Sequence, residues 1–384
     1  MSDDVRPFRI DIPEAVLDDL RERLARTRWP DQIGASWDYG TDIAELRALC
    51  EHWRTTFDWR AAEATLNAFP QFTTEIDGQN VHFLHVRSPH DGALPLIVTH
   101  GWPGSVWEFV QLVGPLTDPT AHGGRAEDAF HLVVPSMPGY GFSGPTTTPG
   151  WDPKRIAETW AKLMARLGYE LYGAQGGDWG AIVTANLGVV DAPHLAGIHL
   201  NMVVARPPDA AQPMAGVEPD EVEGVQAMAH FQAEETGYQQ IQGTKPQTLS
   251  YGLNDSPAGL AGWILEKFRT WSDCDGDVLS SFTMDDLLAN ITIYWVTGTI
   301  GSSCRLYCER RRAAQRDGSA PPRVEVPTGA AIFPKELYRP PRAWADAAYN
   351  ITHWQRYEHG GHFAAMEVPD ALVGDVRQFF ATVR

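Results

Sequence analysis

Long apolar runs, cysteines and basic residues are all scarce in this sequence, and each shortage excludes a class of protein. No stretch approaches the roughly 18 consecutive apolar residues that a membrane-spanning helix needs, so we expect no membrane segment. The opening MSDDVRPFRI is acidic and lacks the apolar region of a secretory signal, so we expect none. Four cysteines in 384 residues are too few for a disulfide framework.

The cysteine spacing also argues against a metal site. Cys304 and Cys308 are four residues apart and could share a helix face, but no second cysteine pair or nearby histidine completes a ligand set. We therefore expect free thiols, no bound metal and a cytoplasmic location. The 31 basic residues are outnumbered by 49 acidic ones, and the net charge of −18 should repel nucleic acid and anionic lipid.

The apolar pattern predicts an α/β fold. Before residue 76 the chain has a helical stripe over Ile12–Arg28 and several Trp- and Phe-bearing segments. After it, strand-like runs such as LPLIVTHG, FHLVVPSMPG and YELYGAQ alternate with amphipathic stretches such as Pro153–Gly168. This alternation is typical of βαβ units with a mostly parallel sheet, whose functional residues gather beyond the carboxyl ends of the strands.

The change in pattern along the chain predicts three regions. Residues 1–75 are expected to form an N-terminal segment that wraps the core. Residues 76–205 and 313–384 are expected to form the α/β core, and residues 206–312, helical and aromatic-rich, an inserted helical lid.

The segment LYGAQGGDWGAIVTANLG resembles the nucleophile elbow of α/β-hydrolases, with Asp178 where many hydrolases carry serine. Small residues flank the apex because a strained strand-to-helix turn crowds the backbone. The sequence contains no G-x-S-x-G. A carboxylate at this position suits attack on sp³ carbon and formation of an alkyl ester. The plainer interpretation is an aspartate that only caps a helix.

Hydrolysis of such an ester needs oxyanion donors and a base. HGWPGS follows the strand LPLIVT and resembles the H-G-x-P turn of many α/β-hydrolases, which implies the backbone N–H groups of Trp102 and Trp179 as the oxyanion donors; alternatively, HGWP is only a tight turn. Of two late histidines, His359 and His362, the second is favoured because it follows a glycine pair and opens an apolar helix.

An acid is expected after the preceding strand, where it would orient the histidine. Glu336 in FPKELY has that position, Asp346 is a weaker alternative, and Glu336 could also be a solvated acid beside Lys335.

Across nearly its whole length the sequence resembles the epoxide hydrolases of the microsomal type, in their soluble bacterial and fungal branch. The motifs that carry the resemblance occur in order: FRIDIPEAVLDDLRERLARTRWPD, HGWPGS, PSMPGYGFS, GGDWGA, QIQGTKPQTLSYGLNDSPAGLAGWILEKF, YWVTGTIGSSCRLYCE, VPTGAAIFPKEL and GGHFAAMEVP. We expect no counterpart of the membrane anchor of the mammalian members. The resemblance implies conversion of an epoxide and water to a vicinal diol, without a cofactor.

By motif match, the resemblance also implies two lid tyrosines that hold the epoxide oxygen, Tyr238 and Tyr307. It makes Asp178 the nucleophile, Glu336 the orienting acid and His362 the base. A small-molecule epoxide is then the expected partner. Two other functions stay open, a haloalkane dehalogenase and a non-catalytic binding protein on the same fold. The sequence leaves open the identity of the epoxide, the selectivity, the role in detoxification or biosynthesis, and the oligomeric state, with a homodimer as one option.

Overall fold

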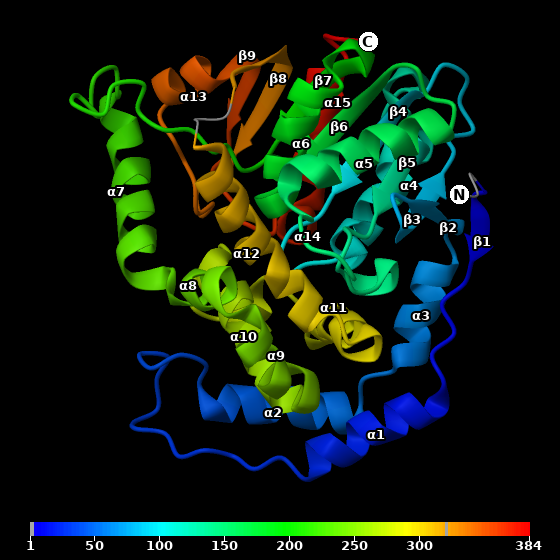
Figure 1. The fold of residues 1–384 in the computed structure, drawn as a ribbon, viewed down its shortest axis with the longest axis vertical. Helices are drawn as coiled ribbons and strands as arrows, with labels where there is room; N and C mark the ends of the chain where they lie inside the picture. Colours follow the sequence, from blue (N-terminus) through cyan, green and yellow to red (C-terminus); the bar gives the residue numbers. More distant parts are fainter. Residues whose placement is uncertain (1–3, 319–321) are drawn as a thin grey trace.

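A nine-stranded sheet forms the core of the protein (Figure 1), seen in a computed structural model that describes residues 4–318 and 322–384. The strand order is β1-β2-β3-β5-β4-β6-β7-β8-β9, antiparallel from β1 to β5 and parallel from β5 to β9. The mostly parallel α/β sheet predicted from the sequence is therefore confirmed. The strands are β1 (Arg6–Phe8), β2 (Gln71–Ile76), β3 (Gln79–Val86), β4 (Leu94–Thr99), β5 (Phe130–Pro135), β6 (Tyr172–Gly176), β7 (Leu195–Leu200), β8 (Val324–Ile332) and β9 (Tyr349–Arg356).

Helices cover both faces of the parallel part of the sheet, which explains why its strands are apolar without alternation. On one face α5 (Pro153–Arg166) and α6 (Asp178–Val190) pack together, and on the other face α4 (Val110–Thr117) packs with α15 (Pro369–Phe380). Buried apolar side chains accordingly form two clusters, one on each side of the sheet. The apolar runs LPLIVT and FHLVVP are β4 and β5, buried between these layers.

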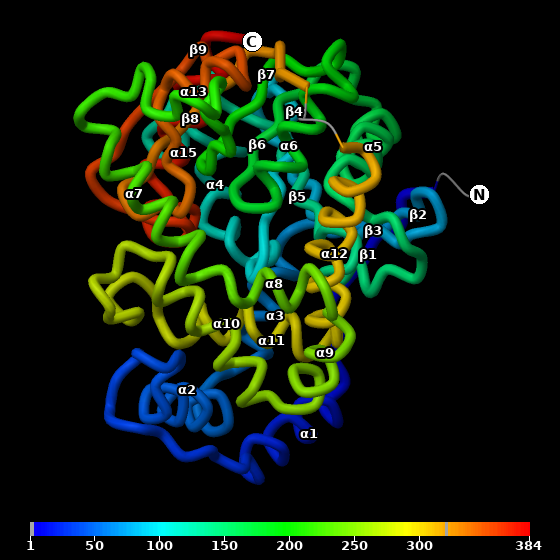
Figure 2. The backbone as a smooth tube through the Cα atoms, turned by 60° about the vertical axis from the view of Figure 1, so that its left-hand side comes forward, coloured from blue at the N-terminus to red at the C-terminus, as the bar shows by residue number. Residues whose placement is uncertain are grey.

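A layer of helices lies beyond one end of the sheet (Figures 1 and 2). It consists of α8 (Gly237–Thr244), α9 (Pro246–Asp255), α10 (Pro257–Trp271), α11 (Met284–Thr297) and α12 (Ile300–Asp317), preceded by α7 (Val222–His230). The predicted lid, residues 206–312, spans these helices, although α12 continues beyond residue 312. The division into three regions stays a prediction, and residues 1–3 and 319–321 of it lie outside the described part.

The N-terminal region contributes to two parts of the molecule. Its helices α1 (Glu14–Ala25) and α2 (Ile43–Thr55) lie along the outer side of the helical layer, against α10, in both views (Figures 1 and 2). Helix α3 (Trp59–Asn67) leads back to β2. Strands β1 and β2 extend the sheet by antiparallel pairing, which the sequence pattern did not predict. The segment expected to wrap the core thus also supplies its edge.

The remaining helices complete the carboxyl end of the chain. They are α13 (Arg342–Ala348), between β8 and β9, and α14 (Ala364–Glu367), which precedes α15. In the part of the chain that the structure describes, no helix combines the length and the apolar character that crossing a bilayer requires.

Candidate active site

The turn between β6 and α6 is strained and places Asp178 at its apex. Asp178 has φ +49°, in the left-handed region that non-glycine residues seldom adopt. Two glycines make the turn possible. A Cβ on Gly176 would lie 2.3 Å from the backbone of Gly180, and one on Gly180 would lie 1.9 Å from the carbonyl oxygen of Thr99. Strain kept in place by such close packing is typical of a functional residue.

The loop after β4 approaches Asp178 closely enough to bind its carboxylate. A Cβ on Gly101 would lie 2.3 Å from both Cβ and Oδ1 of Asp178, so only glycine fits there. The next residue, Trp102, donates its backbone N–H to Asp178 Oδ1 at 2.7 Å. The oxyanion donor expected in HGWPGS, the Trp102 N–H, is therefore in contact with the carboxylate.

The second expected donor, the N–H of Trp179, lies at the start of α6. The first N–H groups of a helix have no intrahelical acceptor and are free to bind an anion. Within residues 4–318 and 322–384, no hydrogen bond joins this N–H to the Asp178 side chain. Its role in the oxyanion site stays a prediction.

Helix α11 holds the HGWPGS loop from the lid side. Asn290 accepts from Ser105 Oγ at 2.8 Å and donates to the carbonyl oxygen of Pro103 at 2.8 Å. Tyr294 donates its hydroxyl to the carbonyl oxygen of Gly104 at 2.6 Å. These contacts fix the backbone that carries the Trp102 N–H, so the lid helix takes part in shaping the site.

His362 lies between two carboxylates. Its Nδ1 is 2.8 Å from Glu336 Oε1 and its Nε2 is 3.3 Å from Asp178 Oδ2. The loops that carry His362 and Glu336 are joined where Lys335 N donates to the carbonyl oxygen of Gly360. Glu336 is 3% exposed, so it is not a solvated acid beside Lys335.

The competing candidates lie elsewhere. His359 is exposed, and Asp346 is an exposed residue of α13 that pairs with Arg342 at 2.8 Å. Asp178 keeps 17% of its side chain accessible, whereas the side chain of His362 is almost wholly buried. The structure therefore brings together the acid, histidine and elbow aspartate favoured from the sequence.

The charges around His362 change its affinity for a proton. Burial alone would lower the pKa of His362, but the negative charges of Glu336 and Asp178 outweigh it and raise the pKa well above 6.5. The two acidic side chains therefore favour the protonated form of His362 in the free site. Loss of the charge on Asp178 would lower this pKa again.

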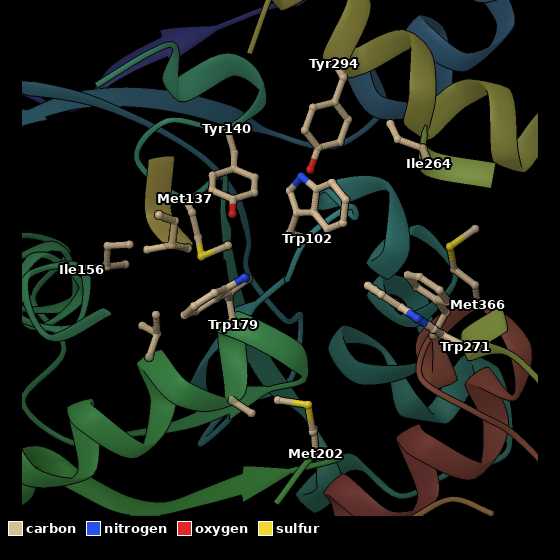
Figure 3. Close-up of a cluster of buried hydrophobic side chains, with 14 of the residues drawn as sticks. Trp102, Met137, Tyr140, Ile156, Trp179, Met202, Ile264, Trp271, Tyr294 and Met366 are labelled. Atoms are coloured by element: carbon tan, nitrogen blue, oxygen red, sulfur yellow. The ribbon is translucent and has the colours of Figure 1, made fainter. Parts of the chain in front are cut away.

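Aromatic side chains contribute to the buried cluster next to the elbow, and Figure 3 shows Trp102, Trp179, Trp271 and Tyr294 in it. The ring of Tyr238, from α8, stacks on Trp102 with centroids 5.3 Å apart. The ring of Tyr307, from α12, meets Trp179 edge-on at 4.7 Å.

The two tyrosine rings meet edge-to-face, with centroids 5.8 Å apart. Burial raises the pKa of Tyr238 and of Tyr307 well above 10, and the charge of Asp178 adds to both shifts. The predicted pair of phenols is thus buried together within the electrostatic reach of Asp178.

Sequence reasoning missed two polar residues of the site. Glu108 and Asn201 line a small cavity together with Asp178 and His362. Asn201 follows β7 and accepts from Gln175 Nε2 at 2.8 Å. Glu108 is a lone acid in the apolar run VWEFV, a signal that could have drawn attention to it.

No metal cluster is evident in the described ranges, where no three His, Cys, Asp or Glu side chains are placed to share an ion. The four cysteines are buried and free.

Comparison with known proteins finds relatives along nearly the whole chain. Residues 5–109 match the family model described as epoxide hydrolase N terminus, and residues 95–250 match that of the alpha/beta hydrolase fold. A Stigmatella aurantiaca protein that bears a provisional epoxide hydrolase name is 46% identical over 99% of this chain and 86% of its own length. Epoxide hydrolase 1 of Sus scrofa is 37% identical over 98% of this chain and 88% of its own. The solved structure of Aspergillus niger epoxide hydrolase superposes with a TM-score of 0.88 at 32% identity, covering 99% of this chain and 97% of that one.

Proposed function

The chain belongs to the epoxide hydrolase family and is an epoxide hydrolase of the α/β-hydrolase fold, and we propose that it acts through a covalent ester on Asp178. Its substrate is a small-molecule epoxide. The observation that carries the proposed route is the arrangement of the Asp178 carboxylate, with Oδ1 bound by the Trp102 N–H at 2.7 Å and Oδ2 next to His362 Nε2 at 3.3 Å. One oxygen is held by the backbone, and the other is free to attack carbon.

In the first half-reaction, Asp178 Oδ2 attacks an epoxide carbon and the C–O bond of the ring breaks. Tyr238 and Tyr307 hold the epoxide oxygen, and one of them transfers its proton to the alkoxide. The phenol pKa values, raised in part by the charge of Asp178, do not prevent this transfer, because the charge leaves the carboxylate as the ester forms. The negative charge then rests on the phenolate.

In the second half-reaction, water attacks Cγ of the ester. With the charge on Asp178 gone, one of the two charges that raise the pKa of His362 is lost, so the imidazolium gives its Nε2 proton to the phenolate and Nε2 becomes available as a base. The Trp102 N–H, already bound to Oδ1, stabilises the anion that develops there, with the Trp179 N–H as second donor. Collapse breaks the Cγ–O bond to the substrate, the imidazolium protonates the leaving alkoxide, and the proton left on Asp178 passes to His362 Nε2, which restores the starting state.

Glu336 is proposed to orient His362 through Nδ1 and to stabilise the imidazolium during this step. The helices of residues 206–312 are proposed to act as the lid that holds both tyrosines over Asp178. Four free thiols support the proposal of a reducing, cytoplasmic location.

Oxygen-18 water in a single turnover, with enzyme in excess over a styrene-type epoxide, tests the ester route. The diol should carry unlabelled oxygen from Asp178, and the peptide that contains Asp178 should gain the label. Label in the diol and none in that peptide would contradict the route. Chloride release from a chloroalkane without diol formation would instead favour a dehalogenase.

A further inference from the structure

A small cavity touches the reactive carboxylate and is the starting point of this inference. Its volume is about 20 Å³, sufficient for one water molecule. The polar side chains in its lining include Asp178, His362, Glu108 and Asn201, while Phe109, Phe363 and Leu372 supply apolar wall. A cavity with several polar groups around one water volume is suited to hold an ordered water.

Glu108 is the acidic member of this lining that the reaction proposed above leaves unused. It lies on the short 3-10 helix η1 (Val106–Phe109), directly after the HGWPGS loop. Its Oε1 atom is buried and has no hydrogen-bond partner among the described residues. A buried polar atom without a hydrogen-bond partner lowers the stability of the folded protein. Its presence at Glu108 therefore calls for an explanation.

The lack of a side chain at Gly104 leaves room for the Glu108 carboxyl. A Cβ on Gly104 would lie 1.6 Å from Glu108 Oε1 and 2.5 Å from Cδ, so any side chain there would displace the carboxyl from the cavity. The hydroxyl of Tyr294 and the Asn290 amide hold the backbone on either side of Gly104. The loop that supplies the oxyanion donor therefore also makes space for an acid.

The electrostatic surroundings of Glu108 link it to the reactive groups. The pKa of Glu108 is raised to about 8. Burial is the largest cause, the charge of Asp178 raises the pKa further, and His362 opposes both. The other titratable groups around it are Tyr294, whose own pKa is raised by burial and by Glu108, and His100, whose pKa burial lowers to about 4. When the ester forms and the charge of Asp178 is lost, the pKa of Glu108 falls, which favours its carboxylate as the acceptor of a water proton.

We propose that Glu108 is a water-positioning residue, which holds the hydrolytic water in this cavity between itself and His362 for attack on the Asp178 ester. The inference rests on the proposed function and deepens it. One O–H of the water donates to Glu108 and the other to His362 Nε2, which leaves an oxygen lone pair for Cγ of Asp178. As the new C–O bond forms, the second proton moves to Nε2; Glu108 forms no bond and loses no proton.

Two half-reactions separate this role from a structural one. Glu108→Gln keeps the shape of the side chain, and Gly104→Ala keeps the acid but displaces its carboxyl. In pre-steady-state measurements of tryptophan fluorescence and quenched mass spectrometry, both variants should form the ester within about 2-fold of the wild-type rate. Both should hydrolyse it roughly 10- to 100-fold more slowly, as expected when a reacting water is no longer positioned. The ester should then accumulate in the steady state.

The matched control is Glu367→Gln. Glu367 is another buried acid near His362, with a pKa that burial raises to about 7, but it accepts from the backbone N–H groups of Phe363 and Asp273 and does not line the cavity. Its loss should lower stability without slowing ester hydrolysis selectively. In the pH profile of ester hydrolysis, Glu108→Gln should remove one ionisation and retain that of His362.

Each outcome decides the inference. If Glu108→Gln hydrolyses the ester at the wild-type rate, or slows both half-reactions equally, Glu108 does not position the water. If the wild-type enzyme itself forms no ester, the proposed function fails first, and the two failures are thereby distinguished.

Discussion

The close packing of Gly180 against β4 predicts a large effect from adding a single methyl group. A Cβ at this position would lie 1.9 Å from the carbonyl oxygen of Thr99, 2.6 Å from its carbonyl carbon and 2.9 Å from the carbonyl oxygen of His100. All three atoms belong to the backbone and cannot rotate away. Because ordinary contact begins at 3.4 Å, the start of α6 would have to move by about 1.5 Å in Gly180→Ala.

This movement determines the expected magnitudes. Alanine favours the helix by about 1 kcal/mol over glycine, whereas overpacking costs about 1–3 kcal/mol. Since the obstacles are backbone atoms, we take the upper value and expect a net loss of about 2 kcal/mol in the free energy of unfolding. The same shift would break the 2.7 Å contact between Trp102 N and Asp178 Oδ1. A displacement on the order of 1 Å should slow alkylation about 100-fold.

Gly374→Ala in α15 is the matched control, because a Cβ there meets nothing within 4 Å. It should stabilise the protein by about 1 kcal/mol and leave alkylation unchanged. Urea unfolding gives the stabilities, and stopped-flow tryptophan fluorescence gives the alkylation rates. A folded Gly180→Ala variant that alkylates at the wild-type rate would refute the argument that this glycine positions the nucleophile.

Four further outcomes are expected. His362→Gln should alkylate and then retain the ester, and a mass spectrum without the adduct would show that the assigned roles are wrong. Tyr238→Phe and Tyr307→Phe should each slow alkylation at least 10-fold while ester hydrolysis is unchanged; equal slowing of both steps would indicate a packing effect. Glu336→Gln should slow ester hydrolysis about 100-fold and leave one burst of alkylation. Hydrolysis at the wild-type rate would show that Glu336 does not orient the imidazole. Because Asp178 raises the pKa of His362, the pKa that governs ester hydrolysis should lie below that of His362 in the free enzyme measured by NMR; equal values would contradict this coupling.

The parts of the site that sequence reasoning predicted are local in the chain. The elbow of Asp178 is a strand, a turn and a helix within a few residues, and glycine spacing alone indicates the crowding that the structure shows. The Trp102 N–H follows from a short motif after an apolar strand. His362 and Glu336 required one more step, since their order after the nucleophile is informative only once the fold class is known.

The parts that sequence reasoning could not supply depend on contacts between distant segments. Tyr238 and Tyr307 came only from a family resemblance, because nothing local distinguishes them from other lid tyrosines. Strand β1 is three residues long, too short to show alternation, and is defined by its pairing with β2. Glu108 stands out in the sequence as a lone acid in an apolar run, but its orphaned Oε1 and the cavity it shares with Asp178 and His362 appear only in the fold. All of these features depend on the tertiary structure.

The geometry also explains why an acid, rather than an alcohol, suits this elbow. A serine would present one oxygen, which must attack and so cannot be fixed beforehand. Asp178 presents two, and the backbone N–H of Trp102 already holds Oδ1 while Oδ2 faces His362. When water later attacks Cγ, charge develops on the oxygen that this donor contacts from the start, so the donor needs no reorganisation in that step. The strained φ of Asp178 and the bare backbone of Gly101 are what bring that donor within reach.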